Sequence, residues 1–81
     1  MARPRPPRLT VLVTGVGAPV GVSIFKALRQ SQLRPRIVAT DANVMSVGLF
    51  RADAAYVLPH ATIDEAGYLR RFQEICADER V

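Results

Sequence analysis

Hydrophobic positions along the chain form three short continuous runs, and the stretches between them follow a different spacing. The runs cover residues 9–14, 36–40 and 54–58, and they are rich in aliphatic and β-branched side chains. The first run is continuous and aliphatic, which is typical of a strand that is covered on both faces in a parallel sheet. The pattern therefore predicts three strands at these positions.

The stretch after the first run has apolar residues at helical spacing, which predicts an amphipathic helix against the sheet. Its apolar face consists of Val20, Ile24, Ala27 and Leu28, with Phe25 beside them. Pro35 ends this helix, because proline disfavours helical geometry in the residue before it. Residues 42–53 then predict a short irregular or helical crossover, in which Met45 and Phe50 are expected to pack against the sheet.

A second helix is predicted to begin at Thr62, where the sequence TIDE matches a capping box. In this motif the Thr62 hydroxyl accepts a hydrogen bond from the amide of Glu65, while the Glu65 carboxylate reaches back to the start of the helix. The apolar stripe of this helix consists of Tyr68, Leu69, Phe72, Ile75 and Cys76. Cys76 is therefore interpreted as a packing residue and not as a reactive thiol.

The alternation of strands and helices predicts an α/β fold, a Rossmann-like partial parallel sheet of order 3-2-1 with helices on its faces. Such folds place a fourth strand beside the first, so the sheet is expected to be incomplete without that strand. Residues 9–81 are accordingly expected to be the truncated front part of a longer polypeptide, or to need a partner that completes the sheet. A homo-oligomer is one such arrangement.

Length and charge narrow the function classes. A chain of 81 residues forms at most one small domain, which buries about 60–65% of its unfolded surface, and a complete two-domain enzyme is excluded. Of the net charge of +4, three charges come from Arg3, Arg5 and Arg8. Because residues 1–8 are also rich in proline, we interpret them as a disordered Arg/Pro-rich tail, and no nucleic-acid partner is predicted.

The sequence also limits location and metal chemistry. No apolar run reaches the roughly 18–20 residues that a membrane span needs, and glycines and a proline interrupt the run that would resemble a signal peptide. Cys76 is the single cysteine, so no internal disulfide can form, and a cytoplasmic location is expected. No CxxC or HxxxH spacing occurs. Neither a metal site nor a catalytic residue is predicted in this segment.

The glycine-rich turn after the first strand is the strongest candidate for binding chemistry. It comprises Gly15, Val16, Gly17, Ala18, Pro19, Val20 and Gly21. Gly15 permits a tight turn, Gly17 lets the backbone approach a ligand, and Gly21 allows the helix to pack closely on the sheet. Amides at the start of the following helix would attract a phosphate or carboxylate group. The alternative is a tight turn that binds no ligand.

Asp41 is a candidate ligand-binding acid at the end of the second strand. It lies twenty residues after Gly21, where a dinucleotide-binding fold places the acid that holds a ribose hydroxyl. The glycine pattern differs from GxGxxG, however, because position 20 is valine. His60 follows Pro59 without an identifiable carboxylate partner, so it is interpreted as an exposed turn residue and not as a catalytic base.

Several segments together resemble the N-terminal domain of ATP-grasp ligases, in the branch of carbamoyl-phosphate-synthase-like enzymes and carboxylate–amine ligases. The similar segments are VLVTGVGAPVGVSIFKALR, IVATDAN, SVGLFRADAAYVLP and DEAGYLRRFQEIC. They cover nearly all of the chain after the arginine–proline tail. The combination of the glycine turn, Asp41, Gly48, Asp53 and Pro59 is more specific than any one motif.

This resemblance implies an enzyme of three parts, in which a pre-ATP-grasp domain precedes a central domain and the domain that binds ATP and Mg²⁺. Such enzymes activate a carboxylate as an acyl phosphate, which an amine then attacks. The turn at residues 15–21 would face a small carboxylate or phosphate substrate. The remaining ATP-grasp domains would act in cis or in trans. This segment is expected to hold no cofactor itself and to be inactive alone.

Two rival interpretations stay open at this stage. The sequence VLVTGVGAPVG also resembles the TGxxGxxG opening of short-chain dehydrogenases and nucleotide-sugar epimerases, which would make Asp41 the acid that binds the ribose of NAD(P). Position 18, where that family has glycine, is Ala18 here. The second rival is a non-enzymatic binding or assembly module.

Overall fold

The computed structural model describes residues 8–81 and shows an open α/β fold with a three-stranded sheet. The strands are β1 (Thr10–Val13), β2 (Arg36–Asp41) and β3 (Ala54–Val57). β2 lies in the centre and pairs in parallel with both neighbours, Thr10 opposite Arg36 and Val38 opposite Ala54. This confirms the predicted parallel order 3-2-1, and β1 and β3 form the two edges.

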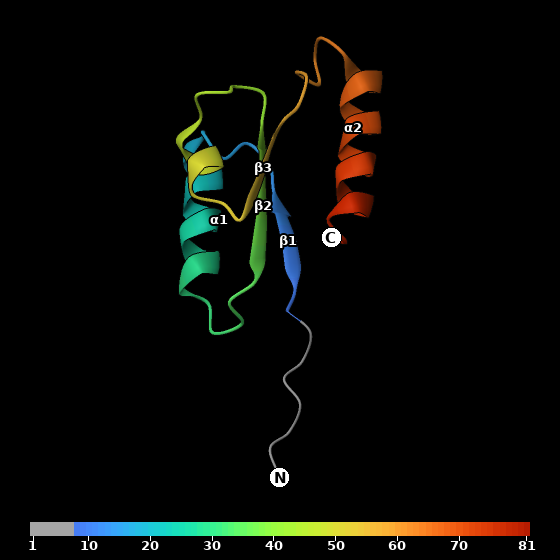
Figure 1. Cartoon of the computed structure of the whole chain (residues 1–81). Coiled ribbons are helices and arrows are strands. Elements are labelled where there is room, and N and C mark those ends of the chain that lie inside the picture. Colours follow the sequence, from blue (N-terminus) through green and yellow to red (C-terminus); the bar gives the residue numbers. More distant parts are fainter. Residues whose placement is uncertain (1–7) are drawn as a thin grey trace.

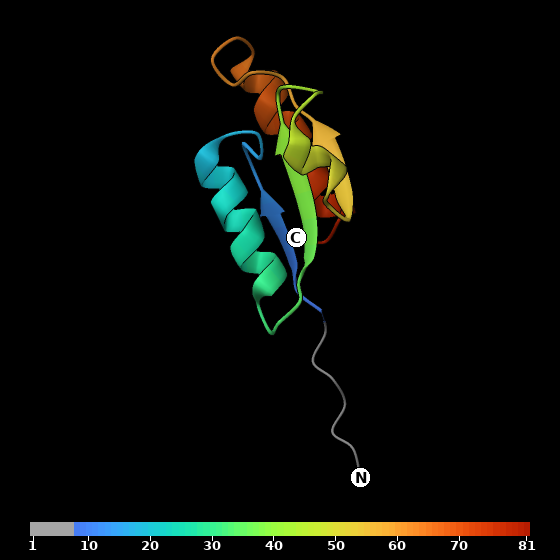
Figure 2. The same ribbon diagram turned by 90° about the vertical axis from the view of Figure 1, so that its left-hand side faces the viewer.

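Two helices cover opposite faces of the sheet (Figure 1). Helix α1 (Pro19–Gln30) connects β1 to β2, and helix α2 (Glu65–Asp78) follows β3. The crossover from β2 to β3 contains a short 3-10 helix, η1 (Val47–Phe50), which packs on the same face as α1. Figure 2 shows α1 over the β1 side of this face and η1 over the side of β2 and β3.

Side chains that alternate along β2 divide the core into two layers. Ile37 and Ala39 face the layer beneath α1 and η1, and Val38 faces the layer beneath α2. The first layer also contains Val13, Val16, Phe25 and Leu49. The second contains Leu58 and Ile75, with Tyr56, Tyr68 and Phe72 packed against them. The central strand β2 is therefore buried on both faces. The apolar run at residues 9–14 predicted such a strand, but β1 is an edge strand that is only partly buried, with Val13 buried at its end.

The orientation of α1 differs from the sequence prediction. Phe25 is buried against the sheet, but Val20 and Ile24 are 72% and 47% exposed. Gly21 explains this rotation, because a Cβ atom there would lie 2.2 Å from the carbonyl oxygen of Gly15. The helix therefore presents its glycine to the turn, and Val20 and Ile24 move to the flank.

Two further details of the crossover and of α2 correct the sequence predictions. Phe50, expected to pack against the sheet, is 75% exposed, and Met45 is 72% exposed. Helix α2 is capped by Asp64, whose carboxylate accepts a hydrogen bond from the amide of Gly67 at 2.9 Å. The predicted capping box starting at Thr62 is therefore wrong. An aspartate is as effective an N-cap as threonine, and it lies two residues closer to the helix.

The amino end of the sheet is held by charged contacts. Arg8, which the sequence assigned to the tail, donates to the carbonyl oxygens of Arg34 and Pro35, at 2.7 and 3.4 Å. The carboxylate of Glu79 accepts hydrogen bonds from Arg36 and from the Tyr56 hydroxyl, which joins the end of α2 to β2 and β3. The rest of the expected tail, residues 1–7, lies outside the described residues.

None of the helices in residues 8–81 combines the length and the apolar character that a membrane crossing requires.

Candidate functional site

A cavity of about 240 Å³ opens at the carboxyl end of the sheet. It lies where β1 and β2 end, beside the segment that leads from β3 to α2. Its lining comprises Thr14, Gly15, Thr40, Asp41, Ala42, Leu58, Pro59, His60, Ala61 and Tyr68. Open α/β sheets bind their ligands at this end, because parallel strands direct their following loops there.

The glycine turn lies beside this cavity and contributes Gly15 to its lining, and its glycines have different roles. Gly15 has a φ of +61°, the left-handed conformation that glycine adopts with the least strain, and this reverses the chain at the end of β1. Gly17 lies so close to Asp41 that an added Cβ would meet the carboxylate oxygen Oδ2 at 2.7 Å. Gly21 packs α1 directly onto Gly15. The backbone contact at Gly21 therefore also requires glycine, whereas at Gly17 a larger residue would have to displace the Asp41 and Ser46 side chains.

The carboxylate of Asp41 holds the glycine turn and the start of the crossover together. Oδ2 accepts a hydrogen bond from the amide of Gly17 at 2.8 Å, and Oδ1 accepts one from the amide of Ala42 at 2.7 Å. The amide of Asn43 lies at 3.5 Å from Oδ1. Asp41 therefore acts in part as a structural link between two segments that are distant in the chain.

Several donors lower the pKa of Asp41 below its ordinary value of 3.8. Burial alone would raise this pKa, but the Ser46 hydroxyl and the amides of Gly17, Ala42 and Asn43 outweigh it. The hydroxyl of Ser46 is buried beside the carboxylate without meeting full hydrogen-bond geometry. The carboxylate is consequently ionised at neutral pH and faces a surface rich in N–H donors.

The start of α1 offers further donors. Its N-cap residue, Ala18, makes no side-chain cap, and its carbonyl accepts the first helical hydrogen bond from Val22 at 2.9 Å. Backbone amides of the first helical turn carry the positive end of the helix dipole. The nearby ionised Asp41 offsets part of this positive potential.

The structure places two of the eight predicted site residues in the lining of the cavity. Gly15 and Asp41 line the cavity, and Gly17 is hydrogen-bonded to Asp41. Val16 differs, because its side chain is fully buried in the core. Val20 lies on the exposed flank of α1.

Other residues of this site were not identified from the sequence. They are Thr14, Thr40, Ser46 and Tyr68. Thr14 and Thr40 each lie at or near the carboxyl end of a predicted strand. Because open parallel sheets bind ligands at this end, their positions indicate that they line the cavity. His60 is exposed, as predicted, but it also lines the cavity.

Within residues 8–81, no three His, Cys, Asp or Glu side chains gather into a set that could hold a metal ion. Comparison with protein-family models, with curated proteins and with solved structures found no match to this chain.

Proposed function

We propose that this chain is the substrate-side segment of an ATP-dependent carboxylate–amine ligase of the ATP-grasp type. The observation that carries the proposal is the hydrogen bond from Gly17 to Asp41, which closes the glycine turn and leaves a small cavity at the carboxyl end of the sheet. A cavity of about 240 Å³ suits a small carboxylate or phosphate substrate. Ligand pockets for larger molecules span about 300–1,000 Å³.

The same geometry argues against a dinucleotide site. A ribose-binding aspartate accepts a hydrogen bond from a sugar hydroxyl, and a carboxylate has about four acceptor positions, so each backbone amide that it binds reduces its capacity for the ribose. Both oxygens of Asp41 already accept from backbone amides of its own chain. The cavity is also smaller than a dinucleotide requires, so the dehydrogenase or epimerase alternative has less support.

The described residues suit the role of a substrate-binding segment in such a ligase. They offer backbone amides, hydroxyls and one histidine around the cavity, and hydrogen bonds from these groups to a small anion would have to outweigh the negative charge of Asp41. In such a ligase ATP and Mg²⁺ would be held by the other domains, in cis or in trans. Those domains would form the acyl phosphate, and this segment would position the substrate beside it.

A titration followed by ¹⁵N NMR tests this proposal on the chain itself. Small carboxylates, NAD and ATP with Mg²⁺ are added in separate series, and each is repeated with the Asp41→Ala variant. We expect a carboxylate to shift the amide signals of Gly15, Gly17 and Gly21 saturably, and NAD to leave them unchanged. The chain alone is expected to hydrolyse no ATP.

The decisive comparison is between NAD and the carboxylates. A saturable NAD shift that disappears in Asp41→Ala would reject the ligase proposal in favour of a dehydrogenase or epimerase. If no compound shifts the glycine amides, the turn is structural and the assembly-module interpretation gains support. Asp78→Ala is the matched control, because Asp78 is an exposed aspartate of α2 far along the chain from the cavity.

A further inference from the structure

A second hollow of about 260 Å³ lies beside the carboxyl-terminal half of α1. It is lined by Phe25, Lys26, Arg29, Gln30 and Arg51. Since α1 returns from the carboxyl end of β1 to the start of β2, its last turns lie at the amino end of the sheet. This hollow is therefore separate from the cavity beside the glycine turn, and the two share no lining residue.

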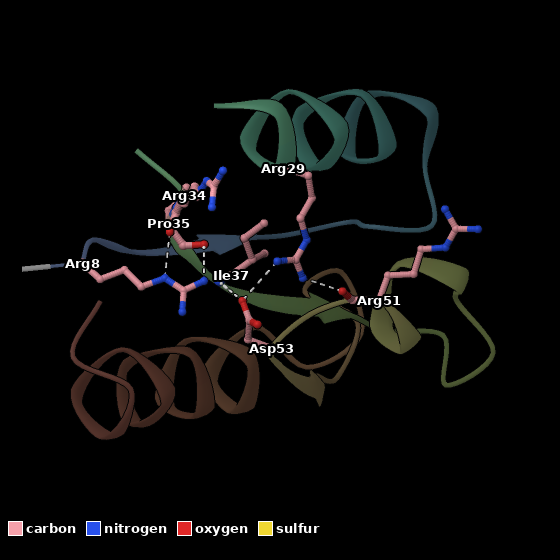
Figure 3. Close-up of polar contacts among 7 residues, drawn as sticks. All are labelled: Arg8, Arg29, Arg34, Pro35, Ile37, Arg51 and Asp53. Carbon is pink, nitrogen blue, oxygen red and sulfur yellow. Dashed lines mark hydrogen bonds and ion pairs between the residues drawn. The ribbon is translucent and has the colours of Figure 1, made fainter. Parts of the chain in front are cut away.

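Arg29 is held in a fixed orientation in this hollow. Its guanidinium donates to the carbonyl oxygen of Arg51 at 2.6 Å and lies 3.5 Å from Oδ2 of Asp53 (Figure 3). It also lies over the ring of Phe25, 5.1 Å from the ring centre. A guanidinium that is already positioned loses little conformational freedom when it binds an anion.

The positive charge here is only partly compensated. Asp53 accepts a hydrogen bond from the amide of Ile37 at 2.8 Å, which together with Arg29 lowers its pKa below the ordinary 3.8. In the described part of the chain neither Lys26 nor Arg51 forms an ion pair. The residues that line the hollow therefore include three cations and no acid, with one acid beside it. The Arg51 side chain extends away from the Arg29 guanidinium (Figure 3), so Arg29 and Lys26 are the cations that a ligand would contact first.

We propose that this hollow binds the phosphate group of a small phosphorylated ligand. Guanidinium and ammonium groups together match the several oxygens and the double charge of a phosphate. Arg29 covers the ring of Phe25, and this residue is only 7% exposed, so little surface remains for stacking a base. The phosphate group alone is recognised, whether it is free or part of an ester.

The test is a ¹⁵N NMR titration of the whole chain with inorganic phosphate, AMP and adenosine. Phosphate and AMP are expected to shift the amide signals of Lys26, Arg29 and Arg51 saturably, and adenosine to have no effect. Comparison of phosphate with AMP separates the two sources, because tighter binding of AMP indicates an ester. Added salt is expected to weaken both interactions.

Variants decide whether these side chains form a site. Lys26→Gln is expected to weaken phosphate binding about fivefold or more, since it removes a charged contact, and Arg51→Gln is expected to weaken it less, since its guanidinium acts from a greater distance. Both side chains are exposed, and circular dichroism checks that the fold is kept. Arg70→Gln is the control with the same change of charge, placed on α2 across the sheet, and it is expected to leave binding unchanged.

Three results would overturn the proposal. The first is the absence of shifts at about 20 mM phosphate, well above the range of specific binding. The second is equal weakening by Arg70→Gln, which would indicate a general effect of net charge. The third is a set of shifts centred on residues 15–21, which would place phosphate at the glycine turn and leave the proposed function intact.

Discussion

Asp41 connects two segments that lie 24 residues apart, the glycine turn and the end of β2. Asp41→Asn replaces a charged acceptor of the Gly17 amide with a neutral amide group. We expect the free energy of unfolding to fall by about 1–2 kcal/mol, because hydrogen bonds to a charged group are stronger than neutral ones. Urea denaturation measures the change. Asp78→Asn should leave the midpoint unchanged, and equal losses in both variants would contradict the role of Asp41.

Gly15 and Gly21 are glycines for different reasons, Gly15 because of its backbone conformation and Gly21 because of its close packing. An added Cβ at Gly15 meets no atom within 4 Å, so Gly15→Ala is penalised only by its left-handed conformation, by about 1 kcal/mol. At Gly21 the same atom would lie 2.2 Å from backbone, and α1 must move. Gly21→Ala should therefore lose more than about 2 kcal/mol. The reverse order in thermal or urea denaturation would contradict the packing of α1 on the turn.

The lowered pKa values of three carboxylates predict how the free energy of unfolding depends on pH. Folding lowers the pKa of Asp53 through the Ile37 amide, of Glu79 through the Tyr56 hydroxyl and Arg36, and of Asp41 through donors that outweigh burial. A lowered folded pKa stabilises the protein above the ordinary values of 3.8 and 4.5, and this contribution is lost as the pH falls through the folded values.

The free energy of unfolding is therefore expected to be level near neutrality and to decrease below about pH 4.5. Denaturant midpoints measured between pH 7 and pH 3 test this. In Asp41→Asn the decrease should be shallower, since one of the groups no longer titrates. An unchanged slope would show that Asp41 has the same pKa in the folded and unfolded chains.

At the scale of elements, α2 depends on its N-terminal cap. Asp64→Ala removes the acceptor of the Gly67 amide and should destabilise the chain by about 1 kcal/mol. Thr62→Ala should change stability little, because Thr62 lies in the turn before the helix. Thermal denaturation followed by circular dichroism compares the two. A larger loss at Thr62 would restore the capping box that the sequence suggested.

The strands were predictable because short apolar runs rich in β-branched residues are typical of strands in a parallel sheet. Which strand is fully covered was not predictable in the same way, since Ile37, Val38 and Ala39 of β2 are fully buried, whereas β1 is only partly buried. The rotation of α1 was not predictable from spacing, since Val20 and Ile24 fit the apolar stripe as well as Phe25 does. The contact of Gly21 with Gly15 decides between these faces, and it is visible only once the helix lies on the turn.

The candidate site was predictable in part for a similar reason. Carboxyl ends of parallel strands meet at one edge, so the proximity of Asp41 and the glycine turn followed from strand order. The position of Ser46 and the hollow around Arg29 and Arg51 depend on where η1 packs. Residues 42–53 carry no periodic pattern that fixes this packing, and the sequence therefore gave no signal for it.

In the molecule as a whole, backbone amides at the two edges of the sheet are expected to be less protected from hydrogen exchange than those of the central strand. The amide of Arg36 donates to the carbonyl of Leu9. Because backbone groups alternate sides along a strand, those of Thr10 and Leu12 face away from β2. Within the described residues β1 has no other neighbour in the sheet. This edge is therefore open to solvent or to an added strand.

Hydrogen exchange measured by NMR should reveal this difference. The amides of Val38 and Ala39 are expected to exchange slowest, near the rate of global unfolding, and those of Thr10 and Leu12 much faster. If Thr10 and Leu12 are protected as strongly as β2, and the protection grows with protein concentration, a second chain completes the sheet. That result would contradict the open edge described for a single chain.

The parallel arrangement of the sheet also has a consequence for how the chain is made. No two neighbouring strands are joined by a tight turn, and Thr10 meets Arg36 only when the segment that forms α1 has crossed the sheet. During synthesis, β1 therefore has no strand to pair with until β2 has left the ribosome. Folding therefore begins with the closure of a long loop and not with the formation of a β-hairpin. The nascent chain consequently exposes an apolar strand for longer than an antiparallel protein of this size would.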